Sequence, residues 1–103
     1  MFKAYKLKLL PGKENELKEQ YENLWQGIIE AIHIYGGKNF SMFLDEKSGD
    51  VVCYIEVENE QLWKRCDKVE LHKRWWENLS GILEMAEHTI PLCSEMNLIY
   101  HLP

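Results

Sequence analysis

Tryptophan is the residue type in this 103-residue chain that most clearly suggests a ligand site, and the chain contains four tryptophans. Trp75 and Trp76 are adjacent and follow Arg74. Neighbouring residues on a helix point about 100° apart, so one indole can anchor the helix while the other reaches an edge or a cavity. Indole faces form a stacking wall for a ring with polarised C–H bonds, such as a pyranose. Equally, both indoles can be core or dimer anchors, because indoles pack strongly. The spacing alone leaves both interpretations open.

The four histidines, His33, His72, His88 and His101, do not have the spacing of a metal site. Two ligands on one helix face would stand four residues apart, and neither such a pair nor an HExxH motif occurs. The GxSxG elbow, the P-loop and GxGxxG are absent too, and no carboxylate pair stands out. We therefore expect no metal, no cofactor and no covalent intermediate.

Composition and charge narrow the function further. Lys and Arg total 12 and Asp and Glu total 17, and the resulting net charge of −5 argues against general nucleic-acid or anionic-membrane binding. The apolar runs fall far short of the roughly 20 residues of a membrane span, and the first residues alternate like a strand rather than a signal peptide. The chain has three cysteines, Cys53, Cys66 and Cys93, which is an odd number, and none of them forms a CxxC motif. A disulfide framework or a zinc site is therefore not expected, and we expect small buried thiols in a reducing cytoplasm.

Alternation and helical periodicity predict one domain, residues 1–103, with four strands and two main helices. Strands are expected at residues 2–9, 39–45, 51–57 and 94–102, and helices at 14–35 and 70–85, with a short helical segment around Trp63. The first helix carries one apolar stripe, from Leu17 through Tyr21 to Tyr35, and stops at the following glycine pair.

The order β-α-β-β-α-β predicts an α+β fold, a ferredoxin-like split sheet with both helices on one face. The second face of such a sheet should meet water, yet the third strand is apolar on both faces, with Val51 and Cys53 on one and Val52 and Tyr54 on the other. A large exposed apolar face is rare on a soluble monomer, so this face should pack on a partner chain or line a ligand cavity. A homodimer could do both.

Several motifs together resemble the L-rhamnose mutarotase family from end to end of the chain. They are Phe2-Lys3-Ala4-Tyr5, the helix with Trp25, Tyr35-Gly36, the NxxxxLD strand at residues 39–45, Trp63, Arg74-Trp75-Trp76 and the final Leu102-Pro103. The resemblance implies a dimeric α+β barrel and a small isomerase that interconverts sugar anomers. It also implies that Trp75 and Trp76 contact the sugar, with Trp63 nearby.

Three positions depart from the family pattern. The family has a Tyr and a His four residues apart on the first helix, the His being the proton donor, and here these are Leu17 and Tyr21. A sugar-contacting Tyr of the second strand is Phe40 here. Mutarotation opens a hemiacetal with a base and an acid, and a phenol of pKa near 10 is a poorer acid–base group than an imidazole near 6.5. We therefore expect a more apolar site and a ligand that is different from rhamnose or less hydroxylated than it.

Two histidines are candidates to replace the missing imidazole. His72 lies one turn before the tryptophan pair, and His88 lies in residues 86–91, which replace an acidic and amide-rich stretch of the family. His33 should miss the pocket, because it lies about 120° around a continuous helix from Tyr21. His101 should point away from the apolar face of the last strand. For each of them, a solvated surface histidine is the alternative.

The sequence thus predicts a cytoplasmic homodimer that interconverts the anomers of a small monosaccharide without cofactor or metal. It predicts no nucleic-acid or membrane partner. The candidate catalytic residue is Tyr21, and the candidate substrate-binding residues are Leu17, Phe40, Trp63, Trp75 and Trp76. The alternative is a non-catalytic binding or structural dimer of the same fold. A monooxygenase-like dimeric barrel is a third hypothesis, by analogy of fold alone.

Overall fold

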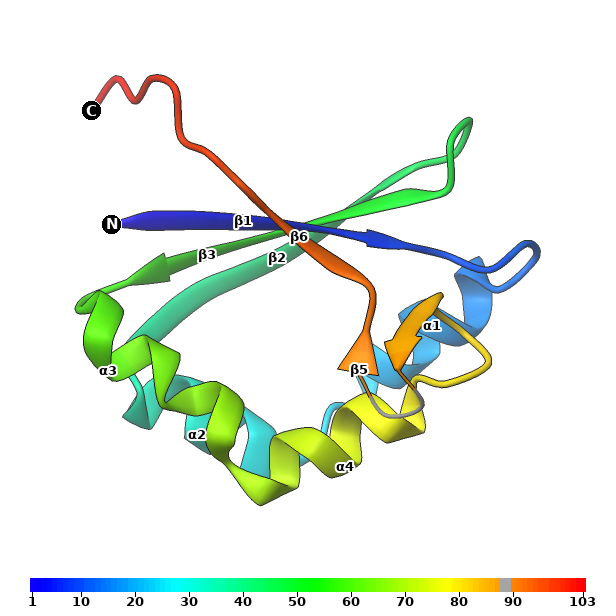
Figure 1. The fold of residues 1–103 in the computed structure, drawn as a ribbon, viewed down its shortest axis with the longest axis horizontal. Coiled ribbons are helices and arrows are strands. Elements are labelled where there is room, and N and C mark those ends of the chain that lie inside the picture. Colours follow the sequence, from blue (N-terminus) through cyan, green and yellow to red (C-terminus); the bar gives the residue numbers. More distant parts are fainter. Residues whose placement is uncertain (88–89) are drawn as a thin grey trace.

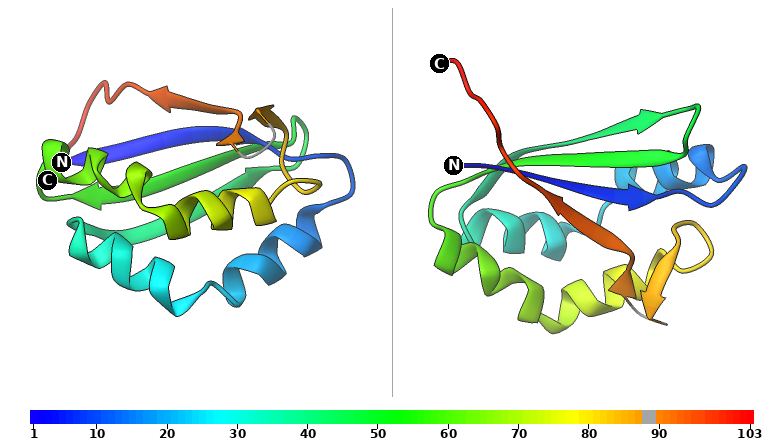
Figure 2. Two further views of the ribbon diagram at one scale, coloured as in Figure 1. Left: turned by 60° about the horizontal axis from the view of Figure 1, so that its bottom comes forward. Right: turned by 45° about the horizontal axis from the view of Figure 1, so that its top comes forward.

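The computed structural model describes residues 1–87 and 90–103 and shows a four-stranded sheet with helices packed against one face (Figure 1). The strand order is β2-β3-β1-β6, and all neighbouring strands are antiparallel. Two turned views place the helices together on one side of the sheet (Figure 2). The predicted ferredoxin-like α+β fold is therefore confirmed. No helix in the described ranges combines the length and the apolar character needed to span a membrane.

The bounds of the elements follow the prediction for the central strands and differ at the helices. The sheet consists of β1 (Phe2–Lys8), β2 (Gly37–Asp45), β3 (Asp50–Val57) and β6 (Cys93–Met96). The helical layer consists of α1 (Glu14–Glu22), α2 (Gln26–Ile34), α3 (Glu60–Lys64), the 3-10 turn η1 (Cys66–Lys68) and α4 (Glu70–Asn78). A small hairpin pairs β4 (Met85–Glu87) with β5 (Ile90–Pro91).

The single long helix predicted at residues 14–35 is wrong, because the chain leaves the helix between α1 and α2. The Asn23 side chain donates a hydrogen bond to the Glu19 carbonyl at 2.9 Å, one of the local contacts by which asparagine competes with helix continuation. Trp25 has extended backbone angles, φ −59° and ψ 134°, and precedes the first residue of α2. The apolar stripe continues across this link, which is why periodicity alone did not reveal it.

The helix predicted at residues 70–85 ends at Asn78. Leu79, Ile82 and Leu83 are buried although they follow α4. Gly81 turns the chain with φ +88°, a left-handed conformation that glycine adopts without steric cost. The turned segment then pairs with the end of β1, where the Leu10 amide donates to the Ile82 carbonyl at 2.9 Å. The turn and this pairing bury the same apolar residues that suggested a helix.

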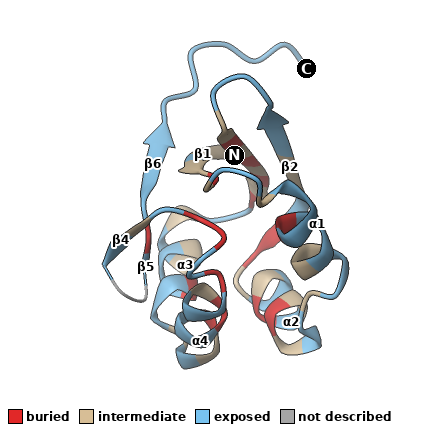
Figure 3. Cartoon of the chain, turned by 90° about the vertical axis from the view of Figure 1, so that its right-hand side faces the viewer, coloured by how far each residue is buried: buried red, intermediate tan, exposed pale blue. Residues whose placement is uncertain are grey.

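The last predicted strand is shorter than expected. Only Cys93–Met96 pairs with β1, and residues 97–103 continue without strand pairing, away from the sheet in Figure 1. This final segment is coloured as exposed in Figure 3. Its apolar side chains are uncovered, with Leu98 62% and Tyr100 75% exposed. The segment therefore presents apolar surface that nothing in the described chain covers.

The core lies between the sheet and the helices. Along β3, alternate residues from Val51 to Val57 are buried on the helix side, while Val52 and Tyr54 are half-buried on the outer side. Phe43 of β2 is 63% exposed, and its partner in the register is Val52. Two apolar faces of the third strand are thus present as predicted, and the outer one is open in this chain.

Replacing Gly37 by alanine is expected to destabilise the fold, because the helices and the sheet meet closely at this residue. A Cβ atom there would lie 2.7 Å from the Trp63 ring, 2.8 Å from Ile55 and 2.9 Å from Ile32. Overpacking a core position costs about 1–3 kcal/mol. At Gly27 of α2, a Cβ would meet only the flexible end of Leu71, and alanine is the better helix former by about 1 kcal/mol. In urea denaturation, the midpoint of Gly37→Ala should therefore be lower than that of Gly27→Ala. Equal midpoints would contradict this packing.

Candidate active site

A cavity of about 290 Å³ lies between the helix-facing side of the sheet and the helices. Six aromatic side chains contribute to its wall, from β1, α1, β2, α3 and α4: Tyr5, Tyr21, Phe40, Trp63, Trp75 and Trp76. Asp67 and His72 also line it. Five of the six candidate site residues thus meet around one space, on the helix side of the sheet. This cavity lies on the opposite side of the sheet from the outer apolar face of β3.

Tyr21, near the end of α1, lines this cavity and a neighbouring one. The indole nitrogen of Trp75 donates a long hydrogen bond of 3.5 Å to its hydroxyl. The Trp75 ring meets the Tyr21 ring edge-on with centroids 5.4 Å apart, and Phe40 stacks on it at 6.0 Å. Burial raises the pKa of the Tyr21 phenol to about 12. Tyr21 is therefore a neutral hydrogen-bond donor at physiological pH.

The adjacent tryptophans of α4 have different environments. Trp75 is only 2% exposed, because it packs edge-on against both Tyr21 and Trp25. Trp76 is partly buried, contributes to the cavity wall and lies 5.8 Å from the His72 ring. One indole thus anchors the helix while the other is freer to face a ligand, as helical geometry suggested.

Trp63 of α3 contributes to the same wall through a contact that the sequence did not reveal. Its indole nitrogen donates a hydrogen bond to the Tyr5 hydroxyl at 3.1 Å. Tyr5 lies opposite Cys53 in the β1–β3 register, and burial raises the pKa of its phenol. Strand alternation puts Tyr5 on the same face of β1 as Leu7, and this pattern was the available signal for a second hydroxyl at the cavity.

Phe40 enters the cavity next to an irregularity in β2. The pairing with β3 shifts between Lys38 and Ser41, so β2 has one extra residue there. Asn39 takes φ 53°, a left-handed conformation that asparagine tolerates better than most residues, and its side chain donates to Glu56 at 3.0 Å. The bulge accommodates the extra residue while Phe40 stays on the cavity side.

Leu17 does not join this lining. Its side chain is 8% exposed and belongs to the hydrophobic core cluster with Ile28 and Trp75. The candidate role of Leu17 as a ligand contact is therefore corrected to a role in packing. The reason is the course of α1: Tyr21, one turn further along, reaches the cavity, whereas Leu17 is covered.

His72 is the one polar or charged residue that is buried in the described chain, with 7% of its surface exposed. Its two ring nitrogens lie 3.7 Å and 3.8 Å from the Cys66 sulfur. Burial lowers the pKa of the His72 imidazole, while the neighbouring Asp67 carboxylate acts in the opposite direction. Burial raises the pKa of Asp67. The solvated-surface alternative for His72 is therefore wrong.

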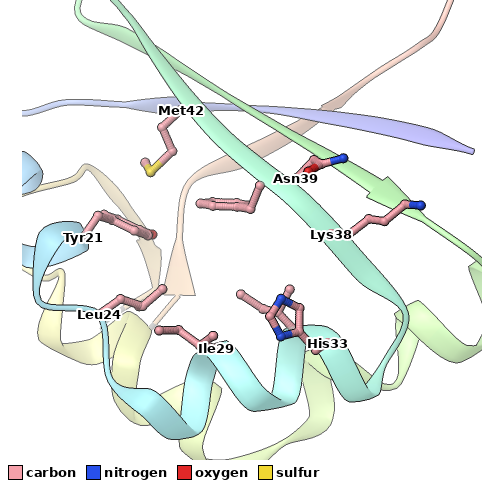
Figure 4. Close-up of a pocket in the computed structure, with 9 residues that line it drawn as sticks. Tyr21, Leu24, Ile29, His33, Lys38, Asn39 and Met42 are labelled. Atoms are coloured by element: carbon pink, nitrogen blue, oxygen red, sulfur yellow. The ribbon is translucent and has the colours of Figure 1, made fainter.

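A second cavity, of about 420 Å³, adjoins the first and shares Tyr21 and Phe40 with it. His33 lines it, and Figure 4 shows that Tyr21 points into the same space while the Lys38 amine points away. His33 is exposed and does not line the first cavity, as expected, although the link at residues 23–25 breaks the continuous helix on which that expectation relied. His101 packs on Phe2 at 4.3 Å, and His88 lies outside the described residues.

Comparison with known proteins decides the family. A family model described as L-rhamnose mutarotase matches residues 3–102. The chain belongs to the L-rhamnose mutarotase family. The L-rhamnose mutarotases of Lachnoclostridium phytofermentans and Clostridium beijerinckii are 34% and 30% identical to it over 100 residues. These alignments cover 97% of this chain and 96% of each relative.

Solved structures extend the mutarotase likeness to the fold. The crystal structure of L-rhamnose mutarotase from Formosa agariphila matches with a TM-score of 0.89 at 20% identity, covering 100% of this chain and 99% of that one. An antibiotic biosynthesis monooxygenase matches with a TM-score of 0.62 at 14% identity, covering 97% and 100%. At 20% and 14% identity, these two matches show a shared fold only. The match to the monooxygenase is therefore no evidence for a monooxygenase activity in this member of the mutarotase family.

The buried thiols of this mutarotase family member are expected to make its stability fall at alkaline pH. Burial raises the pKa of Cys53 and of Cys66 to about 12, whereas thiols in an unfolded chain titrate near 8.5. Stability from these groups is complete below the unfolded pKa and is lost as the pH rises toward the folded pKa. Urea midpoints at pH 7 and pH 10 should therefore differ more for wild type than for the double variant Cys53→Ala, Cys66→Ala. An equal pH dependence would contradict the assignment.

Proposed function

We propose that this chain interconverts the anomers of a small monosaccharide by reversible ring opening. The observation that supports it most directly is the aromatic-walled cavity, to whose wall Tyr21 contributes. Its volume of about 290 Å³ lies at the small end of ligand sites, which begin near 300 Å³. A single pyranose ring is a suitable occupant, with aromatic faces available to stack on its C–H bonds.

The reaction needs a base, an acid and one C–O bond that breaks and reforms. A base removes the proton of the anomeric hydroxyl, the bond to the ring oxygen breaks, and an acid protonates that oxygen. Tyr21 is the proposed partner of the ring oxygen, because its protonated hydroxyl lies on the cavity wall. Only protons move besides this bond, so the proposal includes no cofactor or metal.

The wall composition leads us to propose a sugar with few hydroxyl groups. The family members that this chain resembles are named for L-rhamnose, which is therefore the first sugar to test. Phe40 brings no hydroxyl to the cavity, and Leu17 brings none either, because it lies in the core. Fewer polar partners weaken the recognition of sugar hydroxyls, so deoxy sugars should be preferred.

Saturation-transfer NMR at the anomeric protons tests the activity directly. A panel of aldoses and deoxyaldoses, L-rhamnose included, is measured with and without the protein. The proposal predicts faster anomeric exchange for at least one sugar. No acceleration for any sugar would refute it.

The second candidate is a non-catalytic sugar-binding protein of the same fold. It is favoured by one observation: the raised pKa of Tyr21 makes this phenol a weak acid. The variant Tyr21→His places an imidazole at the same position and distinguishes the two candidates. If anomeric exchange is accelerated by Tyr21→His and not by wild type, the result would favour the second candidate, the non-catalytic sugar-binding protein.

We also propose that the chain forms a homodimer through the outer sheet face. Phe43 is 63% exposed on this face, and the final segment exposes Leu98 and Tyr100. A second copy would cover apolar surface that a soluble monomer rarely leaves open. Sedimentation at micromolar concentration should show a dimer, and a monomer would refute this part. The cytoplasmic location and the absence of nucleic-acid and membrane partners stay predictions.

A further inference from the structure

We propose that the His72 imidazole is the base that removes the proton of the anomeric hydroxyl, on the wall of the cavity that also holds Tyr21. This inference rests on the proposed anomer interconversion and adds a residue to it. The candidate catalytic residue Tyr21 lies on α1, whereas His72 lies on α4. The imidazole would therefore act from a different helix.

The first observation that supports this role is the position of His72 on α4. Residues three and four apart on a helix lie on one face, so His72 shares its face with Trp75 and Trp76. All three side chains line the same cavity. A sugar held against the Trp76 ring would thus lie beside the imidazole, whose ring centroid is 5.8 Å from that indole.

The second observation is the set of hydrogen-bonding contacts that the His72 imidazole makes. A neutral imidazole has one donor and one acceptor nitrogen, and both usually find partners when buried. Both nitrogens lie almost equally far from one sulfur, that of Cys66, at 3.7 Å and 3.8 Å. A single thiol cannot be in line with both. One ring nitrogen therefore has bonding capacity left for a hydroxyl in the cavity.

The charged and titratable neighbours suit a base rather than an acid. From η1, Cys66 and Asp67 line the cavity beside His72, and Cys93 of β6 and Tyr5 of β1 line it from the sheet. Burial lowers the pKa of His72, so the ring is neutral and able to accept a proton at pH 7. The nearby Asp67 carboxylate would stabilise the imidazolium that forms during the reaction.

The steps balance without another reactant. His72 takes the proton of the anomeric hydroxyl, the C–O electron pair moves to the ring oxygen, and Tyr21 gives that oxygen its proton. The open-chain aldehyde rotates about the bond next to its carbonyl. On closure at the other carbonyl face, Tyr21 regains the hydroxyl proton and His72 returns its proton to the carbonyl oxygen. Both side chains end as they began.

Anomeric exchange measured by NMR in wild type, His72→Gln and Lys73→Gln tests this role. Lys73 is the next residue of α4 and is exposed, so its variant is the matched control and should keep the wild-type rate. Removing a general base lowers a rate by about 10²–10⁴-fold, so His72→Gln should lose at least about 100-fold in kcat. The wild-type rate should fall as the pH drops through the lowered pKa of the His72 imidazole, and the residual rate of His72→Gln should not show this fall.

A second variant separates a chemical role from a structural one. His72→Ala opens space beside Trp76, and added imidazole should restore exchange in it in proportion to concentration. A structural histidine would show no such rescue. Wild-type activity with an unimpaired His72→Gln variant would overturn the role of His72 and leave the proposed function standing. Inactivity of wild type with every sugar would overturn both.

Discussion

Truncating Trp75 to alanine is expected to lower the free energy of unfolding by about 3–5 kcal/mol, the usual cost of removing a buried large aromatic side chain. The indole is 2% exposed and joins α4 to both Tyr21 and Trp25. A domain of this size is stable by only about 5–15 kcal/mol, so the variant should unfold at a far lower urea concentration. Far-UV circular dichroism during urea titration measures the difference.

The matched control for this prediction is Trp25→Ala. Trp25 contacts the same ring of Trp75, with centroids 5.1 Å apart, but is 37% exposed. Its truncation removes less buried surface and should cost clearly less. Equal losses in the two variants would mean that Trp75 is not the anchor of the cavity wall.

Replacing Tyr21 by phenylalanine is expected to reduce anomeric exchange by about 100-fold, within the range of general acid–base contributions. The ring, its stacking on Phe40 and its contact with Trp75 would remain, so only the hydroxyl is tested. Because burial holds the pKa of Tyr21 near 12, no limb of the wild-type pH profile between pH 5 and about 9 should come from this phenol. Saturation-transfer rates across this pH range measure both effects.

Tyr54→Phe is the matched control, because this hydroxyl lies on the outer sheet face, 3.2 Å from Glu56. It should leave the exchange rate unchanged. A Tyr21→Phe variant as fast as wild type would remove Tyr21 from the reaction, although it would leave the aromatic cavity as a binding site.

The sheet was predictable because strand patterns reflect which side chains are buried. In β3, burial alternates from Asp50 to Val57, as the apolar pattern indicated. Helix ends were less predictable, because the apolar spacing continues where the backbone stops being helical. Asn23 ends α1 by a side-chain contact, and Gly81 turns the chain while Ile82 remains buried. Both interruptions depend on local hydrogen bonds and turns that the periodicity does not record.

The candidate site was predictable where helix geometry fixes direction. Trp75 and Trp76 diverge as adjacent helical residues must, and both reach the cavity wall. Leu17 was a candidate because of its place in the family pattern, and it packs in the core cluster instead. Tyr5 and Asp67 also line the cavity and were missed as site residues. Alternation along β1 gave a signal for Tyr5, whereas no motif or spacing singled out Asp67.

The link at residues 23–25 divides the cavity wall into two independently adjustable parts. Inserting one residue inside a continuous helix rotates everything beyond it by about 100° and takes apolar side chains out of the core. Here α1 carries Tyr21, while α2 keeps its own buried face at Ile28 and Ala31. A change of length in the link would therefore re-aim the phenol without dismantling the second helix. Divergence of ligand preference among descendants of this fold can proceed through such insertions and deletions, at little cost to foldability.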